Sequence, residues 1–169
     1  MKLAILSDIH DHVWNLKKAL ATPELQRTDA LLFCGDLCAP FIIHLLGKTY
    51  TNPIHLVLGN NDGDLAAITS NMKQYPHMHL HGEYFRGKFD GKTVAMNHYP
   101  DKALKLAELG IYDMVFYGHN HSLKVEKIGT TLMINPGPVM GFHGGRLEDI
   151  PATFITLDTQ SMQTTTHQI

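Results

Sequence analysis

The sequence contains little cysteine, and this excludes one class of fold. Its two cysteines, Cys34 and Cys38, lie on either side of Gly35-Asp36. A disulfide framework in a chain of this size needs more cysteines, and the Cys-x-x-x-Cys spacing is not that of a zinc ribbon or a thioredoxin-like motif. We therefore expect two free thiols that pack as small apolar side chains.

The sequence also lacks an excess of charge of one sign and any long apolar run. Its net charge of -2 provides no electrostatic attraction to nucleic acid or to an anionic membrane. No stretch reaches the roughly 18 apolar residues of a membrane-spanning helix. The apolar start at 1–6 is too short for a signal peptide, because Ser7-Asp8 follows at once. We expect a cytoplasmic protein.

What the sequence does contain is enough apolar residues for one packed domain. The chain has 169 residues, of which 44% are hydrophobic and 18% are charged. At this length roughly two-thirds of the surface of the unfolded chain can be buried on folding. We predict a single domain over residues 1–169. The unusual feature of the composition is the presence of 12 histidines.

The first half of the chain alternates between strand and helix patterns. Short apolar runs near 2–6, 30–34 and 54–58 predict buried strands, and amphipathic patterns near 13–22, 40–47 and 64–72 predict helices. Such alternation is typical of parallel strands with helices on the faces of the sheet. In open α/β sheets, ligands bind at the carboxyl ends of the strands.

The second half is richer in strands. We predict a strand at 77–81, a hairpin over 82–98 that turns at Asp90-Gly91, a helix at 102–109 and a strand at 114–117. Further strands are expected at 123–128, 130–135, 152–157 and 162–167. So many strands favour two packed sheets over one open sheet. We expect the first sheet to hold the βα repeats and the second to hold the hairpins and the later strands.

Polar side chains with metal-ligand chemistry follow five of the predicted strands. They occur in Asp8-Ile9-His10, Gly35-Asp36, Gly59-Asn60-Asn61-Asp62, Asn97-His98 and Gly118-His119-Asn120-His121. Asp, His and Asn side chains that gather at strand ends are suited to two divalent cations, with Asp36 shared between them.

Histidine spacing alone does not identify a ligand set in this sequence. The His-x-His spacing occurs four times, and His77, His79 and His81 would share one face of a strand. That row can be a packed or solvated face, or a third metal site. His119 and His121 differ from it because they follow a buried strand and a glycine.

The ordered set of loops resembles the calcineurin-like metallophosphoesterases, and the compact length resembles their small single-domain phosphodiesterase branch. The match extends from residue 5 to about residue 138, and includes Asn135-Pro136-Gly137-Pro138 in place of an Asn-Pro-Gly-Ser segment. The resemblance implies an α/β fold, a four-layer αββα sandwich of two mixed sheets flanked by helices. It also implies two sets of metal ligands, one of Asp8, His10, Asp36 and His121 and one of Asp36, Asn60, His98 and His119.

The sequence departs from this family at two positions. Many family phosphatases carry a histidine directly after the Asn ligand, where it serves as general acid, whereas this chain has Asn61. An amide cannot donate a proton at neutral pH, so hydrolysis of a poor leaving group would be slower by about 10²- to 10⁴-fold. The small phosphodiesterase branch lacks this histidine as well. The second departure is Tyr99, where a glycine often follows the ligand His98.

The implied ligands explain how such a site would work. Two cations about 3.5–4 Å apart lower the pKa of a bridging water, so that hydroxide can attack phosphorus at neutral pH. Oxygen and imidazole ligands suit Mn²⁺, Fe²⁺, Zn²⁺, Co²⁺ or Ni²⁺, and we expect Mn²⁺. The ligand histidines need partners for their outer ring nitrogens, and the expected acceptors are Asp62, Asn97 and Asn120.

We therefore predict a dinuclear metal-dependent phosphodiesterase that acts on small phosphodiesters or nucleotide derivatives. The residues expected to act in catalysis are Asp36, Asn60, Asn61 and His98. His12, Arg86, His143 and Arg146 are further groups that could reach a substrate. The alternatives are a phosphomonoesterase or nucleotidase, and a non-catalytic scaffold of the same fold. We expect a small phosphate ester as the partner and leave a homo-oligomer open.

Overall fold

Apolar runs that are buried along their whole length form the centre of the first sheet. The computed structural model describes residues 1–169. This sheet has the order β13-β12-β1-β2-β3-β4. Its parallel strands are β1 (Lys2–Leu6), β2 (Ala30–Phe33), β3 (Ile54–Leu56) and β4 (Met78–Leu80). Alternate residues of β1 face opposite sides, so that Leu3 and Ile5 enter one core and Ala4 and Leu6 the other.

The placement of the last two strands corrects one expectation. β12 (Thr153–Asp158) and β13 (Thr164–Gln168) belong to the first sheet, where β12 pairs antiparallel with β1, and not to the second. The βα repeats build outward from one side of β1 and leave its other edge open. Because Phe154 and Ile155 are buried on opposite faces of β12, this strand needs a cover on each side. Beside β1, one face of β12 packs into the core under the helices and the other face packs into the core between the two sheets.

The second sheet has the order β5-β6-β7-β9-β8. The hairpin of β5 (Tyr84–Phe89) and β6 (Lys92–Asn97) turns at Asp90-Gly91 as predicted, and both turn residues have positive φ. β6 pairs parallel with β7 (Met114–Phe116), and β7 pairs parallel with β9 (Thr131–Asn135). β8 (Lys124–Ile128) forms the antiparallel edge.

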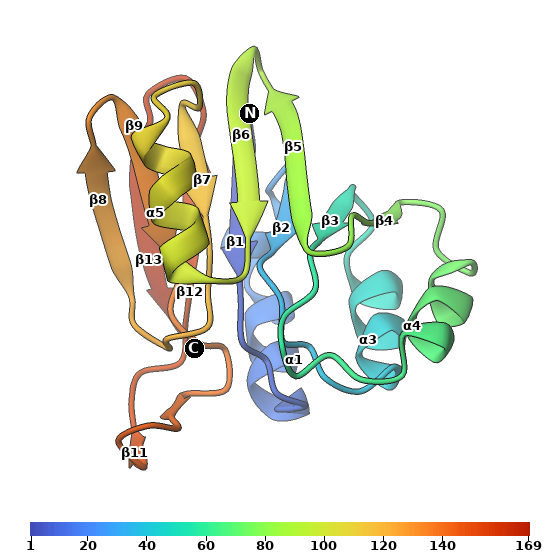
Figure 1. Cartoon of the computed structure of the whole chain (residues 1–169). Helices are drawn as coiled ribbons and strands as arrows, with labels where there is room; N and C mark the ends of the chain where they lie inside the picture. The colour runs from blue at the N-terminus through green and yellow to red at the C-terminus, as the bar shows by residue number, and fades with distance from the viewer.

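Helices cover the outer face of each sheet, and three hydrophobic cores separate the four layers (Figure 1). The first sheet packs against α1 (Val13–Ala21), α2 (Pro23–Gln26), α3 (Phe41–Thr49) and α4 (Leu65–Met72), and the second against α5 (Pro100–Glu108). The core between the two sheets holds 16 buried residues. The predicted four-layer αββα sandwich is confirmed. None of the five helices has the length and apolarity that a membrane crossing requires.

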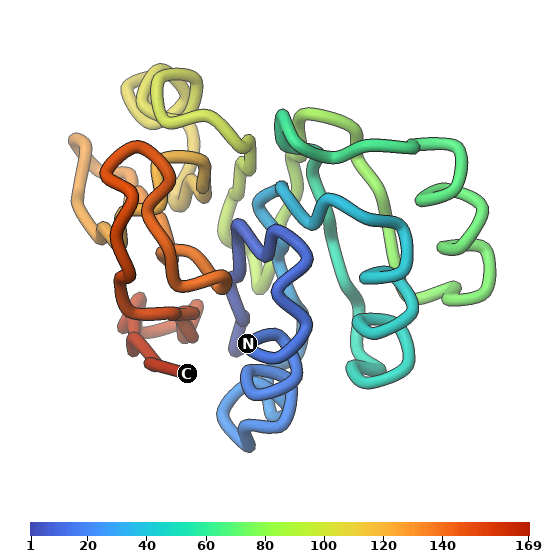
Figure 2. Tube along the Cα trace, turned by 90° about the horizontal axis from the view of Figure 1, so that it is seen from below, coloured from blue at the N-terminus to red at the C-terminus, as the bar shows by residue number.

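Two elements were not predicted. One is the short helix α2, which Thr22 caps and Pro23 begins. The other is a small hairpin of β10 (Phe142–His143) and β11 (Glu148–Asp149) within the glycine-rich segment before β12. Figure 2 shows the orange segment that leads into this hairpin beside the blue loop after β1, where Val139 and Met140 donate backbone hydrogen bonds to Ser7 and Asp8. The hairpin is thereby fixed beside the carboxyl ends of the strands.

Candidate metal centre

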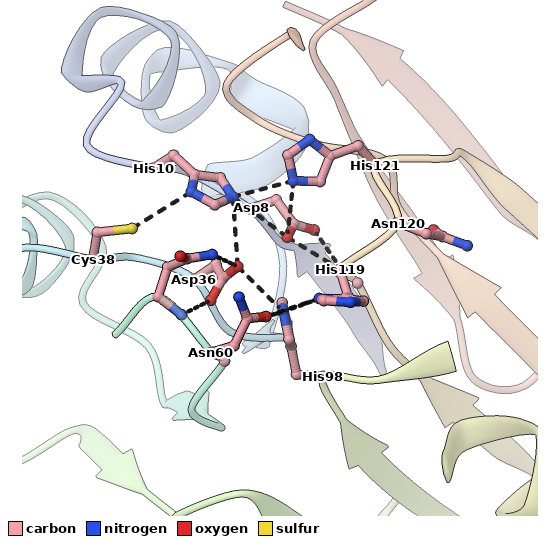
Figure 3. A network of polar contacts seen from close by, with 12 residues as sticks. Asp8, His10, Asp36, Cys38, Asn60, His98, His119, Asn120 and His121 are labelled. Carbon is pink, nitrogen blue, oxygen red and sulfur yellow. Dashed lines mark hydrogen bonds and ion pairs between the residues drawn. The ribbon is translucent and has the colours of Figure 1, made fainter. Parts of the chain in front are cut away.

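The loops that follow the strands contain several residues with positive φ angles. Five of the seven residues predicted as metal ligands have positive φ: Asp8, His10, Asp36, His119 and His121, with values from 43° to 73°. Left-handed backbone is uncommon for residues other than glycine, and it persists where the surrounding structure imposes it, often at functional sites. These loops turn sharply so that their side chains point back toward a common centre (Figure 3).

The first group consists of Asp8, His10 and His121. Asp8 Oδ1 lies 3.8 Å from His10 Nε2 and 3.5 Å from His121 Nε2. The two Nε2 atoms lie 3.1 Å apart. One carboxylate oxygen and two imidazole nitrogens within 4.8 Å of one another could hold a divalent metal ion.

The second group consists of Asp36, His98 and His119, with Asn60 beside them. His98 Nε2 lies 3.2 Å from Asp36 Oδ2 and 3.3 Å from His119 Nδ1. The amide oxygen of Asn60 lies 3.2 Å from His98 Nε2 and 2.8 Å from His119 Nδ1. This set offers the same chemistry as the first group, with a neutral oxygen added.

Asp36 connects the two groups. Its Oδ2 atom lies 3.2 Å from His98 Nε2 and 3.5 Å from His10 Nε2, which belongs to the other group. Asp8 and Asp36 are each 1% exposed or less. The structure therefore brings all seven residues predicted as ligands into one cluster, with Asp36 at its middle (Figure 3).

The outer nitrogens of three of these histidines have partners that we did not predict. His98 Nδ1 donates to the carbonyl of Cys34 at 2.7 Å, and His121 Nδ1 donates to the carbonyl of Phe142 at 2.6 Å. His10 Nδ1 lies 3.5 Å from the thiol of Cys38. A proton on Nδ1 leaves the inward-facing Nε2 of His98 and His121 free to act as a ligand.

The expectation that Asp62, Asn97 and Asn120 accept from the ligand histidines is wrong. Asp62 instead accepts backbone N–H groups of Asp36, Gly59 and Cys38. Asn97 bonds to the backbone of Glu83 and Tyr99, and Asn120 accepts from Asn135. These side chains hold the loops in place, while backbone carbonyls and a thiol orient the imidazoles. Carbonyl partners could not be predicted because every residue carries one.

Two glycines allow the carboxylates to reach the centre. A Cβ atom on Gly59 would lie 2.7 Å from Cγ of Asp36, and one on Gly118 would lie 2.6 Å from Oδ2 of Asp8. Both separations are shorter than a real side chain tolerates. The backbone N–H of His119, next to Gly118, then donates to both oxygens of Asp8 at 3.1 and 3.2 Å.

The charges in the cluster are mutually stabilised. Burial alone would raise the pKa of Asp8, but hydrogen bonds from His10 and His121 hold it well below its ordinary value. Burial is likewise outweighed at Asp36, whose pKa is lowered by His98 and Asn61. For His98 and His121, burial is again the opposing effect, and the neighbouring carboxylates raise the pKa of each imidazole. Both carboxylates are therefore ionised at neutral pH.

An open cleft of about 500 Å³ lies over the cluster, and no lysine or arginine lines it. Asn60 and Asn61 form part of its wall, and His143 and Gly144 of the unpredicted hairpin form another part. Of the other groups proposed from the sequence, His12 caps α1, Arg86 lies over the ring of Tyr84, and Arg146 pairs with Glu148. Tyr99 packs its ring against His119, with the ring centroids 5.1 Å apart.

Comparison with known proteins finds similarity over nearly the whole chain. The model of the calcineurin-like phosphoesterase superfamily domain matches residues 1–162. Phosphodiesterase MJ0936 of Methanocaldococcus jannaschii is 30% identical over 165 residues, which cover 96% of each protein. A solved structure described as a novel archaeal phosphodiesterase has a TM-score of 0.88 at 27% identity and covers 100% of both chains.

More distant structures share the fold alone. Wild-type Vps29 of Entamoeba histolytica in complex with zinc has a TM-score of 0.70 at 15% identity and covers 100% of this chain and 98% of its own. The phosphoesterase Yfce of E. coli has a TM-score of 0.65 at 18% identity and covers 100% of this chain and 98% of its own. The family predicted from the ligand loops is thus confirmed by the family match and by the 30% identical relative. The chain belongs to the calcineurin-like phosphoesterase superfamily.

Proposed function

We propose that this chain is a metal-dependent phosphodiesterase that holds two divalent cations in the cleft. The observation that carries the proposal is the position of Asp36, whose Oδ2 atom lies within 3.5 Å of ring nitrogens from both ligand groups. A carboxylate in that position can contact two cations at once. Asp8, His10 and His121 would complete the ligands of one cation, and Asn60, His98 and His119 those of the other.

The orientation of two histidines also fits the binding of divalent metal ions. His98 and His121 direct Nε2 inward, and backbone carbonyls hold the opposite nitrogen of each ring. Such outer partners fix the tautomer and the orientation that a ligand histidine needs. Oxygen and imidazole donors favour Mn²⁺, Fe²⁺, Zn²⁺, Co²⁺ or Ni²⁺ over metals that prefer thiolates, and Mn²⁺ remains our expectation.

Two bound cations would supply positive charge to the phosphoryl oxygens and lower the pKa of a nearby water. The residues of the chain determine how much positive charge remains. Only Asp8 and Asp36 contribute negative charge to the ligand set, because the oxygen ligand Asn60 is neutral. No lysine or arginine lines the cleft. The balance of two cations, two carboxylates and one hydroxide is +1, which suits the single negative charge of a phosphodiester.

Asn61 bears on the choice between diesters and monoesters. It lies in the cleft next to the ligand Asn60, yet it bonds to Asp36 and cannot donate a proton to a leaving group. This disfavours a phosphomonoesterase or nucleotidase. The name of the 30% identical relative, a phosphodiesterase, agrees with this choice. We also propose that residues 1–169 act as one domain, because each sheet contributes side chains to two of the three cores.

Turnover of two artificial substrates tests the proposal. Protein stripped with a chelator and reloaded with Mn²⁺ is assayed on bis-(4-nitrophenyl) phosphate and on 4-nitrophenyl phosphate. We expect metal-dependent turnover with the diester preferred, and a loss of about 100-fold or more in Asp36→Asn. Asp101→Asn, an exposed residue in the first turn of α5, serves as the matched control. A faster monoester would favour a phosphomonoesterase, and no turnover with any of the five metals would favour a scaffold.

A further inference from the structure

A second group of histidines lies away from the cleft, at the edge of the first sheet. His55 is on β3, His79 is its register partner on β4, and His81 follows β4 directly. Residues two apart in a strand share a face. The three imidazoles therefore point to one side, toward the second sheet, where the ring centroids of His55 and His81 lie 5.1 and 4.5 Å from that of Phe85.

The nitrogens of two of these rings meet directly. His55 Nδ1 lies 3.0 Å from His81 Nε2, and the two rings are almost parallel, with centroids 5.2 Å apart. The ring of His79 stacks on the ring of His55 at 5.1 Å. His77, which the sequence placed in the same row, is not part of this group, because its Nε2 donates to the carbonyl of Tyr50 at 2.9 Å. The histidines that lie together are therefore His55, His79 and His81, instead of the row of His77, His79 and His81 that the spacing predicts.

We propose that His55, His79 and His81 form a separate site for a borderline transition-metal ion such as Zn²⁺, Ni²⁺ or Cu²⁺. Two nitrogens on one tetrahedral ion with bonds of 2.0–2.1 Å lie about 3.3 Å apart, close to the spacing of His55 and His81. His79 is exposed, so its ring can turn about the side-chain bonds to supply the third nitrogen. Water takes the remaining position on the ion.

The surroundings keep this site ready to bind a cation. Burial and the neighbouring imidazoles lower the pKa of His55 to about 4, and the same effects lower the pKa of His81. Both rings are therefore neutral at physiological pH, and protons do not compete for their nitrogens. Phe85 and Phe89 pack against the ring of His55 and keep water from that side.

The chemistry of this site differs from that of the cleft. The three residues offer imidazole nitrogens alone, and Mn²⁺ stands lowest in affinity among the first-row divalent ions for such a set. A bound ion would connect β3 to the edge strand β4, and so stabilise this edge of the sheet. The inference does not depend on the proposed phosphodiesterase activity.

A zinc titration in the presence of saturating Mn²⁺ tests the proposal. Zn²⁺ is added to the full chain while calorimetry counts the bound equivalents and electron paramagnetic resonance counts the Mn²⁺ released. We expect the Zn²⁺ bound to exceed the Mn²⁺ released by one equivalent, because Zn²⁺ can also replace Mn²⁺ in the cleft. Binding of this extra equivalent should weaken by about tenfold or more in His79→Gln and His81→Gln. His77→Gln, on the same stretch of chain, should bind Zn²⁺ like the wild type.

His79→Gln keeps the test decisive even if the half-buried His81 is needed for folding, because His79 is exposed. Thermal unfolding measured without metal reports any loss of fold in either variant. Total Zn²⁺ uptake equal to the Mn²⁺ released, or an extra equivalent that binds equally well to His79→Gln and the wild type, would overturn the proposal. Diester turnover in Mn²⁺ should be unchanged in His79→Gln, so a failure here is distinct from a failure of the proposed function.

Discussion

Asn61 donates two hydrogen bonds to the carboxylate of Asp36. Its backbone N–H donates to Oδ1 at 2.8 Å, and its side-chain amide donates to Oδ2 at 2.9 Å. Both bonds favour the ionised carboxylate and contribute to the lowered pKa of Asp36. In this chain the residue after Asn60 therefore positions the shared carboxylate, whereas a histidine there could also donate a proton.

Asn61→His should shift the preference of the protein toward monoesters. The imidazole can protonate a leaving oxygen, which an amide cannot, so the ratio of monoester to diester turnover should rise by about tenfold or more. The ratio is measured with the two 4-nitrophenyl esters and with an alkyl monoester as a third substrate. An alkoxide leaving group depends more on protonation than 4-nitrophenolate does. Asn61→Gln keeps an amide and is the control. An unchanged ratio in Asn61→His would contradict the role assigned to this position.

Asn60→Asp should weaken substrate binding while leaving the metal content intact. The change adds a negative charge where a neutral oxygen lies 2.8 Å from His119 Nδ1, and the ligand set then loses its single positive charge. We expect KM for a diester to rise by about tenfold, because close charge interactions in a partly solvated site are worth one to a few kcal/mol. Steady-state kinetics with metal analysis of the same samples measures the effect. An unchanged KM with full metal content would refute the charge argument.

The sequence predicted which loops lie together, because each one follows a strand with its own apolar signature. The order of the five loops along the chain indicated Asp8, Asp36 and His98 together, and their assignment as metal ligands stays a prediction. The position of β12 beside β1 could not, because the pairing of Ile5 with Ile155 joins residues that are far apart in the chain. The hairpin before β12 was also missed, since a glycine-rich segment with few apolar residues carries little strand signal.

Contacts between side chains and the backbone also could not be predicted from the sequence. The carbonyls of Cys34 and Phe142 orient His98 and His121, yet the identity of those two residues gives no indication of this role. Similarly, the approach of His55 to His81 depends on the register of β3 and β4. The periodicity of one strand cannot specify its register with another.

The stability gained from Mn²⁺ should increase with pH. The pKa values of His98 and His121 are raised in the metal-free fold, so their contacts with the carboxylates stabilise it fully below about pH 6.5, the ordinary imidazole pKa. This contribution is lost as the pH rises through the raised values. Metal ions need the deprotonated nitrogens and so replace the lost contacts at higher pH.

The measurement is the difference in Tm between Mn²⁺-loaded and chelator-treated protein at pH 6, 7 and 8. Histidines outside the cluster contribute equally to both samples and cancel in the difference. We expect this difference to be largest at pH 8, and to be small at every pH in Asp36→Asn, which removes the shared ligand. A difference that stays flat or decreases from pH 6 to pH 8 would show that protons and metal do not compete for these imidazoles.

Gly59→Ala should disable the centre through a steric effect, without removing any ligand. The added Cβ would lie 2.7 Å from both the backbone nitrogen and Cγ of Asp36, so that either the loop after β3 or the carboxylate must move. Forcing a methyl group into such a contact costs about 1–3 kcal/mol. Displacement of the shared carboxylate should also weaken metal binding by about tenfold or more, since misplaced supports of a metal ligand have effects of that size.

Gly63→Ala is the matched control, because it lies in the same loop and its added Cβ would meet no atom within 4 Å. Urea unfolding and Mn²⁺ titration of both variants separate the loss of stability from the loss of metal. We expect Gly63→Ala to stay within about 0.5 kcal/mol of the wild type, as surface substitutions usually do, and to bind metal normally. If Gly59→Ala matched it in both measurements, the carboxylate of Asp36 would not need the space that this glycine leaves open.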